Sequence, residues 1–411
     1  MTASEQTLDE RKEILRRQVM EMIPSGIEIS DRELEILIGR RIEETAGEEY
    51  IRLGEKRNLR RKVFNSIRKM DVLQDMLEDE EITEIMVNGP DHIFIEKEGY
   101  LTETGLSFGD RGRLEDIAQQ IASAGNRIVN ESSPILDVRL ADGSRVNIVV
   151  PPIAIEGPVI TIRKFPKEAM TMEKLIQMGA VTEEAEEFLK KMVEAKYNIF
   201  ISGGTGAGKT TFLNILSNFI PHTERVITIE DSAELQIQSI DNLVRLEARN
   251  ANVEGKNQVT IRDLVRSALR MRPDRIIVGE IRDSAAIDLL TAMNTGHDGS
   301  LSTGHANSPA DMLNRLETLV LMGLDIPLEA IRQQIASGID LIVHLGRLRD
   351  KSRKVLEICE VTEVADGRIQ LSPLYVFREE GERRGRVLGE LKRTGRRLRA
   401  LDKCHRSGVE I

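Results

Sequence analysis

The 411-residue sequence predicts an α/β protein built around a mostly parallel sheet with helices on both faces. Three observations predict this class. From residue 171 to residue 377, short apolar segments alternate with helix-like segments, which is typical of a parallel sheet wrapped by helices. Residues 71–160 combine several strand-like segments with one helix, which indicates a small α+β domain. Residues 1–70 show helical periodicity alone and predict an N-terminal helical bundle.

The first 70 residues are predicted to form solvated helices that make contacts. Apolar side chains recur at helical intervals and would share one face: Leu34, Leu37, Ile38 and Ile42. Two segments have the spacing of a capping box, in which side chains bind the free amides of a helix's first turn: Thr7-x-x-Glu10 and Ser30-x-x-Glu33. Pro24 and Gly26 are expected to separate the first two helices.

In residues 71–160 the hydrophobic period becomes that of strands. Short strands are expected at 82–89, 92–99 and 100–104, followed by a helix at about 111–125. Residues 136–150 predict a hairpin, because Asp142-Gly143 supplies the positive φ that a tight turn requires. Residues 161–170 begin with an extended segment and are expected to link this domain to the next.

The predicted parallel sheet has strands at 197–202, 225–230, 275–280, 299–305 and 340–345. After residue 345 the pattern changes to hairpins, with Asp366-Gly367 at one turn. The tail, residues 378–411, contains eleven basic and six acidic residues. We expect this tail to be a solvated helical face, with a partner-binding surface as the alternative.

The composition excludes several classes of protein. A net charge of −10 argues against a protein that binds nucleic acid over its whole surface, so no nucleic-acid partner is expected. Two cysteines, Cys359 and Cys404, cannot form a disulfide framework or a cysteine-rich zinc site. The first residues lack the apolar stretch of a signal peptide, and no apolar run is long enough for a membrane-spanning helix. We therefore expect a cytoplasmic protein.

The segment GGTGAGKTT fits the phosphate-loop pattern G-x-x-x-x-G-K-[ST] and lies between an apolar strand and a helix, as this motif requires. Its glycines let backbone amides surround phosphate oxygens at a helix N-terminus. Lys209 would reach the β- and γ-phosphates, and Thr210 would hold Mg²⁺. The expected ATP-binding residues are Gly203, Gly204, Thr205, Gly206, Ala207, Gly208, Lys209, Thr210 and Thr211.

Charged residues follow several of the predicted parallel strands. Because ligands of an open parallel sheet bind at the carboxyl ends of its strands, these residues should gather beside the phosphate loop. They are Glu230, Asp231, Glu234, Glu280, Arg282, Asp283 and His305.

His297 and His305 lie eight residues apart in NTGHDGSLSTGHANSP, residues 294–309. Metal ligation is a weak explanation, because Mg²⁺ takes oxygen ligands and no cysteines accompany the histidines to make a closed zinc site. We expect them to orient the γ-phosphate through hydrogen bonds or to link the site to its neighbours. A buried polar loop is the alternative.

Four ordered blocks resemble the hexameric secretion ATPases of type II and type IV systems, type IV pili and archaella. They are the phosphate loop at 203–211, an aspartate box at 227–236, a Walker B block at 272–283 and a histidine box at 294–309. The similarity runs from about 75 to 377. RLADGSRVNIVVPPIAIEGPVITIRKF and the histidine box look most like the CpaF-type ATPases of tight-adherence (Flp) pili. The chain lacks the four-cysteine zinc site of other pilus-assembly members, and conjugative and archaellum ATPases remain alternatives.

The resemblance implies a RecA-like ATPase domain at 171–377 and a role for each matching residue. Glu234 would polarise the attacking water, and Glu280 would support Mg²⁺ together with Thr210 and Glu234. The box histidines match His297 and His305. Arginines that would act on the phosphates or at subunit interfaces match Arg139, Arg163, Arg266, Arg270 and Arg282.

The resemblance also implies a homo-hexamer. ATP would close the N-terminal domain against the RecA-like domain, and release would reopen them. The partner would be an inner-membrane platform protein of a pilus or secretion system, which places the ring at the inner face of the membrane. Two other classes remain open: a nucleic-acid motor with a RecA-like core, and a nucleotide switch that does not hydrolyse ATP.

Overall fold

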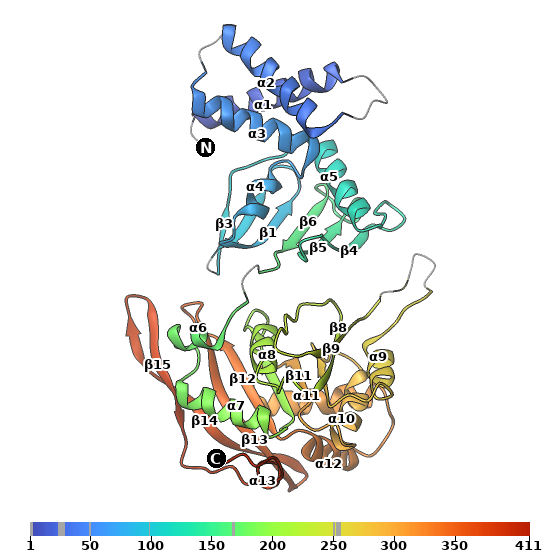
Figure 1. Cartoon of the computed structure of the whole chain (residues 1–411), viewed down its shortest axis with the longest axis vertical. Coiled ribbons are helices and arrows are strands. Elements are labelled where there is room, and N and C mark those ends of the chain that lie inside the picture. Colours follow the sequence, from blue (N-terminus) through green and yellow to red (C-terminus); the bar gives the residue numbers. More distant parts are fainter. Residues whose placement is uncertain are drawn as a thin grey trace. The chain divides into compact units, whose positions relative to one another are not determined.

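The computed structural model describes residues 3–23, 29–48, 51–97, 99–166, 169–249, 251 and 256–411. The chain divides into two compact units, Met1–Lys167 and Glu168–Ile411, each described by itself below (Figure 1). No helix within the described ranges is both long and apolar enough to cross a membrane.

The first unit begins with a three-helix bundle formed by α1 (Ala3–Met22), α2 (Asp31–Glu48) and α3 (Leu53–Arg68). Its core includes Leu34, Ile38 and Ile42, as the helical spacing predicts. The Ser30 capping box is confirmed, because Ser30 N donates to Glu33 Oε2 over 2.8 Å. The Thr7 box is wrong: α1 already begins at Ala3, so Thr7 lies inside the helix. The predicted break at Pro24 and Gly26 falls outside the described residues.

The rest of this unit is an α+β fold with a six-stranded antiparallel sheet in the order β3-β2-β1-β6-β5-β4. The predicted hairpin is confirmed, with Gly143 at φ 92° between β4 and β5. The start of the predicted linker is wrong, because residues 161–163 belong to β6. The elements are α4 (Leu73–Glu78), β1 (Ile82–Asn88), β2 (Ile93–Lys97), β3 (Tyr100–Glu103), α5 (Arg111–Ala124), β4 (Ile135–Arg139), β5 (Arg145–Val149) and β6 (Val159–Arg163).

The second unit has a nine-stranded sheet in the order β15-β14-β13-β12-β7-β11-β10-β8-β9. The six strands from β12 to β9 in this order are parallel, and the other three are antiparallel. The strands are β7 (Ile199–Gly203), β8 (Arg225–Glu230), β9 (Asn242–Glu247), β10 (Arg275–Val278), β11 (Leu301–His305), β12 (Leu341–Arg347), β13 (Arg353–Ala365), β14 (Arg368–Arg383) and β15 (Arg386–Arg393).

Helices cover both faces of this sheet, as predicted for the RecA-like fold. Alternating side chains of β7 show this arrangement, because Ile199 and Ile201 enter one core and Phe200 enters the other. The first core takes side chains from α6 (Met172–Gln177), α7 (Glu183–Glu194), α8 (Lys209–Ser217) and α13 (Asp402–Ser407). The second takes them from α9 (Ile261–Ala268), α10 (Ala285–Asn294), α11 (Pro309–Leu321) and α12 (Leu328–Gly338).

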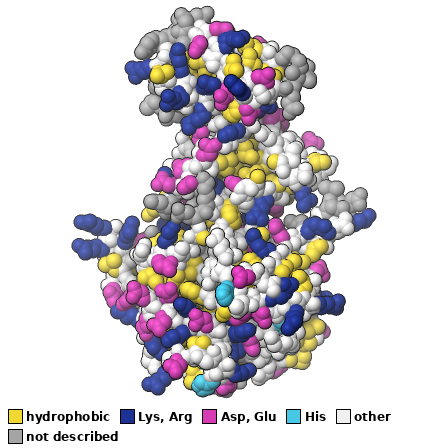
Figure 2. Space-filling view, in the orientation of Figure 1, with side chains coloured by type: hydrophobic (Ala, Val, Ile, Leu, Met, Phe, Trp, Pro, Cys, Tyr) yellow, Lys and Arg dark blue, Asp and Glu magenta, His cyan; other side chains and the backbone are white. Residues whose placement is uncertain are grey.

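The prediction of a solvated helical tail at 378–411 is wrong. Its first part completes β14 and forms β15, which join the large sheet. Its last part is held on the same unit, where Tyr197 Oη donates to Ala400 O and Glu360 Oε1 accepts from Ala400 N. The charge run marks an exposed hairpin instead, and Figure 2 shows basic side chains gathered at the projecting end of β14 and β15.

Candidate nucleotide site

The phosphate loop connects β7 to α8 in the centre of the parallel sheet. β7 ends at Gly203 and α8 begins at Lys209, which is the strand–loop–helix context that the motif requires. Gly206 and Gly208 have φ values of 71° and 92°, which side chains rarely tolerate. At Gly203 there is no room for a side chain, because a Cβ there would lie 2.5 Å from Leu345 O. The loop therefore needs glycine for its curvature and for its packing.

Lys209 is nearly buried at the start of α8 and points back toward the carboxyl ends of the strands, which we call the carboxyl edge of the sheet. Its Nζ donates to Gly204 O over 3.0 Å and lies 3.2 Å from His305 Nδ1. An ammonium group can only donate, so we assign Nδ1 as the acceptor and the ring proton to Nε2. The pKa of His305 is lowered, first by burial and further by the charges of Lys209, Arg282 and Arg315, so the ring is neutral at neutral pH.

Glu280 lies two residues beyond the last residue of β10, next to His305. Its Oε1 is 3.0 Å from His305 Nε2, and its Oε2 accepts from Arg282 Nη2 over 2.7 Å. Burial raises the pKa of Glu280, but the Arg282 hydrogen bond and the charges of Arg282 and Lys209 outweigh it, so the net shift is downward. Glu280 is therefore an ionised carboxylate in contact with the histidine that touches Lys209.

Magnesium fits this arrangement as an ion held mainly by nucleotide oxygens. Glu280 Oε1 is buried and accepts no hydrogen bond, which leaves an oxygen for an ion or its water. Thr210, in the first turn of α8, adds a hydroxyl oxygen. Among the described residues, no group of three or more His, Cys, Asp and Glu forms a complete metal cage.

Glu230 is a buried carboxylate at the end of β8, and it organises the loop that carries Glu234. Its Oε2 accepts from Glu234 N over 2.7 Å and from Leu235 N over 2.9 Å. Burial raises the pKa of Glu230, and these two hydrogen bonds oppose the shift only in part. The pKa of Arg282 is raised, first by its hydrogen bond with Glu280 and in smaller part by the charge of Glu234. The sequence shows Glu230 at a strand end but gives no sign of this role.

The structure does not bring His297 into this cluster. His297 precedes β11, whose far end is His305, and the strand alone spans about 13 Å. The carbonyl of His297 accepts from Ser300 Oγ, and its buried Nδ1 has no partner among the described residues. Within a single chain β11 therefore separates the two histidines, so only His305 lies beside this chain's own phosphate loop, and a link to a neighbouring site stays the expectation for His297.

Two predicted arginines also lie away from the phosphate loop. Arg266 is in the last turn of α9 and Arg270 lies two residues beyond that helix, before β10 begins, so both sit at the opposite edge of the sheet. Arg266 Nε donates to Asp288 Oδ1 on α10 over 2.7 Å, and Arg270 is exposed.

Arg139 and Arg163 belong to the first unit, where their side chains differ in burial and in contacts. Arg139 is half-buried, donates to Gly143 O over 3.2 Å and lies over the Phe165 ring. Arg163 is exposed, and its Nε is 3.9 Å from Glu84 Oε1.

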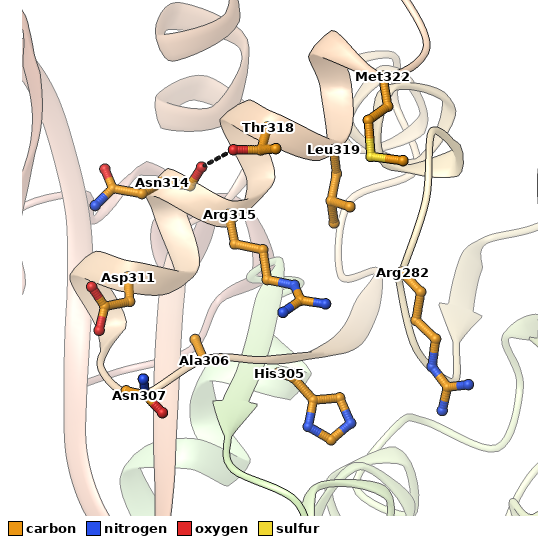
Figure 3. A pocket seen from close by; sticks show the side chains of 10 residues that line it. All are labelled: Arg282, His305, Ala306, Asn307, Asp311, Asn314, Arg315, Thr318, Leu319 and Met322. Atoms are coloured by element: carbon orange, nitrogen blue, oxygen red, sulfur yellow. Dashed lines mark hydrogen bonds between the residues drawn. The ribbon is translucent and has the colours of Figure 1, made fainter.

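Arg353 and Arg315 are at this edge but were not predicted. Arg353, on β13, donates from Nε to Gly206 O over 2.8 Å and so braces the phosphate loop. Arg315, on α11, lines a pocket of about 520 Å³ that also includes His305 and Arg282 (Figure 3). Arg353 follows Gly206 by 147 residues, so local sequence pattern carries no signal for this contact.

A phosphate loop at the carboxyl edge of a parallel sheet, with a lysine, a histidine and a carboxylate in contact beside it, defines a P-loop nucleotide-binding protein of RecA-like fold. The chain belongs to the type II/IV secretion system protein family, whose model matches residues 68–407.

Similar proteins support this membership. A Mycobacterium tuberculosis protein assigned by name to conjugal transfer is 36% identical over 306 residues, which cover 73% of this chain and 86% of that protein. The type IV secretion system protein VirB11 of Bartonella henselae is 32% identical, with 71% and 91% covered. The X-ray structure of the Legionella pneumophila ATPase DotB has a TM-score of 0.51 at 22% identity, covering 72% of this chain and 81% of that one, and shows the shared fold.

Proposed function

We propose that this protein is a Mg²⁺-dependent ATPase that powers a secretion, conjugation or pilus machine. The observation that carries the proposal is the contact series from Lys209 through His305 to Glu280, directly beside the phosphate loop. A loop that only bound nucleotide would not require an ionised carboxylate, Glu280, linked to its lysine through a histidine. This arrangement is suited to hydrolysis as well as binding.

In this mechanism the loop amides and Lys209 hold the β- and γ-phosphates. Glu234 orients the attacking water, and Glu230 fixes the loop on which Glu234 stands. Mg²⁺, when bound, neutralises charge on the phosphate oxygens, and Thr210 and Glu280 would hold it directly or through water. His305, neutral and accepting from Lys209 at Nδ1, lies beside Glu280 and senses the γ-phosphate through Lys209.

We also propose a homo-hexameric ring in which neighbouring chains complete each site. Arg266, Arg270 and His297 lie at the edge opposite their own phosphate loop, so in this reading they act on a neighbour's site or form the interface. Arg139 and Arg163 would contact nucleotide phosphates when ATP closes the two units of the chain. Arg282 would neutralise charge on the transferred phosphoryl group.

Which machine the ring drives is a further part of this proposal. Relatives named for conjugal transfer and for type IV secretion favour a conjugative or type IV secretion system. The resemblance to CpaF-type ATPases rests on two stretches and favours a tight-adherence pilus, and an archaellum motor is a further alternative. In each case the ring would work at the inner face of the membrane through a platform protein. Scoring a gene deletion for DNA transfer and for surface pili separates these machines.

ATP turnover as a function of protein concentration tests the enzyme and the ring together. We expect turnover per chain to rise steeply with concentration and to disappear in Glu234→Gln. Glu363→Gln, an exposed carboxylate on β13, is the matched control and should leave turnover unchanged. Turnover that is flat with concentration would contradict the shared site, and turnover that survives Glu234→Gln would contradict the role of that carboxylate.

A further inference from the structure

A pocket adjoins the nucleotide site between α11 and the segment that follows β11 (Figure 3). Its volume is about 520 Å³. One end is polar and is lined by Arg282, His305 and Arg315, whereas Leu319 and Met322 line the other end. Figure 3 shows the guanidinium of Arg315 pointing from α11 toward the space beside His305. The mechanism proposed above uses His305 and Arg282 but gives no role to the rest of this pocket.

The polar end carries one uncompensated positive charge. Arg282 is paired, with Nη2 2.7 Å from Glu280 Oε2 and Nη1 3.6 Å from Asp231 Oδ2. Arg315 is exposed and has no hydrogen bond or ion pair in the described part of the chain. Asp311 stands one turn earlier on α11, but its carboxylate points to a different side in Figure 3. A free guanidinium with five donors is therefore available to an anion.

His305 forms a shared wall between this pocket and the phosphate loop. One face of the pocket is His305, and the Nδ1 of the same ring is 3.2 Å from Lys209 Nζ. The pocket thus begins where the γ-phosphate of a bound ATP would end. Hydrolysis frees an anion at this point, because the water oxygen bonds to the γ-phosphorus while the bond to the β–γ bridging oxygen breaks. The products are ADP, inorganic phosphate and a proton.

We propose that this pocket is a transient site for the released inorganic phosphate, with Arg315 as its principal donor. This inference rests on the proposed function and adds a second anion site to it. Arginine suits the task because its planar fork binds two phosphate oxygens at once. Inorganic phosphate that moves there leaves the nucleotide loop before ADP does.

The test measures inorganic phosphate binding to the ADP-bound full-length protein by ³¹P NMR titration. Arg315→Gln should weaken phosphate binding by about tenfold to a hundredfold, the effect of losing a charged hydrogen bond. The phosphate affinity of Arg315→Lys should lie between those of the wild type and Arg315→Gln. Affinity for a non-hydrolysable ATP analogue should not change. Arg384→Gln is the matched control, because it removes an equally exposed arginine from the β14–β15 turn, away from the pocket.

Each other outcome overturns the proposal in a different way. If Arg315→Gln weakens the ATP analogue and phosphate equally, Arg315 belongs to the nucleotide site itself. If phosphate binding is unchanged, but turnover loses its dependence on protein concentration, the pocket receives a carboxylate of a neighbouring chain. Because phosphate binding is measured without turnover, an absence of ATP hydrolysis in the wild type contradicts the proposed function and not this site.

Discussion

Glu230 and Glu280 are partly or fully buried carboxylates at the same edge of one sheet, yet their pKa values shift in opposite directions. Glu280 has Arg282 and Lys209 nearby, and the Arg282 hydrogen bond together with these two charges lowers its pKa despite burial. In the described part of the chain, Glu230 accepts hydrogen bonds from the backbone amides of Glu234 and Leu235, and burial outweighs these bonds, so its pKa rises. The cationic neighbours thus decide which carboxylate stays ionised for ion binding, and Glu230 serves as a positioning residue.

Glu230→Gln should stabilise the protein at alkaline pH. The folded-state pKa of Glu230 lies above its unfolded value near 4.5, so ionising this carboxylate costs stability at high pH and costs none below that value. Glutamine keeps an acceptor oxygen for the amides of Glu234 and Leu235. We expect a higher Tm than wild type at pH 8, with a difference that shrinks toward pH 4.5. Thermal scans across pH check this, and a difference that did not change with pH would contradict it.

The chemical identity of the site was predictable, but its supporting residues were not. Lys209, Glu280 and His305 follow apolar strands, so strand order alone places them at one edge. Arg353 and Arg315 reach the same edge from distant elements, and nothing local distinguishes them from other exposed arginines. The motif that contains His297 and His305 does not show that β11 lies between them and keeps the two histidines at opposite ends.

At the scale of elements, the phosphate loop offers a test of packing that is independent of catalysis. A Cβ on Gly203 would lie 2.5 Å from Leu345 O, while a Cβ on Gly204 would have no atom within 4 Å. Gly203→Ala should therefore lower Tm by about 3–8 °C, the effect of overpacking in a unit of this size. Gly204→Ala is the control and should leave Tm unchanged. Equal effects of the two substitutions would show that backbone crowding at Gly203 does not matter.

The C-terminal helix α13 is bound to the large sheet through Lys403. Its Nζ is 2.7 Å from Asp298 Oδ1 and 2.7 Å from Asp340 Oδ2, and Asp340 Oδ2 also accepts from Asn198 N. Lys403→Met would leave the largely buried carboxylate of Asp340 without its cationic partner. This substitution should lower the unfolding free energy by roughly 2–4 kcal/mol. Adding Asp340→Asn should recover part of this loss. Chemical denaturation measures both, and an unchanged midpoint for Lys403→Met would contradict the role of α13.

Strand and helix positions in the parallel sheet were predictable because apolar runs there are short, buried and well separated. The tail was mispredicted for a physical reason: β15 is an edge strand whose exposed positions are charged, so its composition matches that of a solvated helix. β9 was missed for the same reason, since it is the other edge strand and few of its side chains are buried.

At the scale of the whole molecule, each unit carries its own cores, and the first unit is tied together by charge. Asp71 Oδ1 accepts from Lys12 Nζ on α1, and Asp71 Oδ2 accepts from Arg113 Nε on α5, each over 2.9 Å. Lys12 and Asp71 are almost fully buried. These pairs join the helical bundle to α5 of the α+β fold.

Substitutions of Arg139 and Arg163 should differ in their effects on thermal stability and on ATP turnover. Arg163 is exposed and has only a distant carboxylate, so Arg163→Gln should leave Tm unchanged and lower ATP turnover at least tenfold if it reaches phosphates in the closed state. Arg139 also supports its own hairpin through Gly143 O and Phe165, so Arg139→Gln should lower Tm as well as turnover. Arg111→Gln on α5 is the control for charge. Steady-state turnover and thermal scans of the full chain decide this, and unchanged turnover in Arg163→Gln would contradict a catalytic role for Arg163.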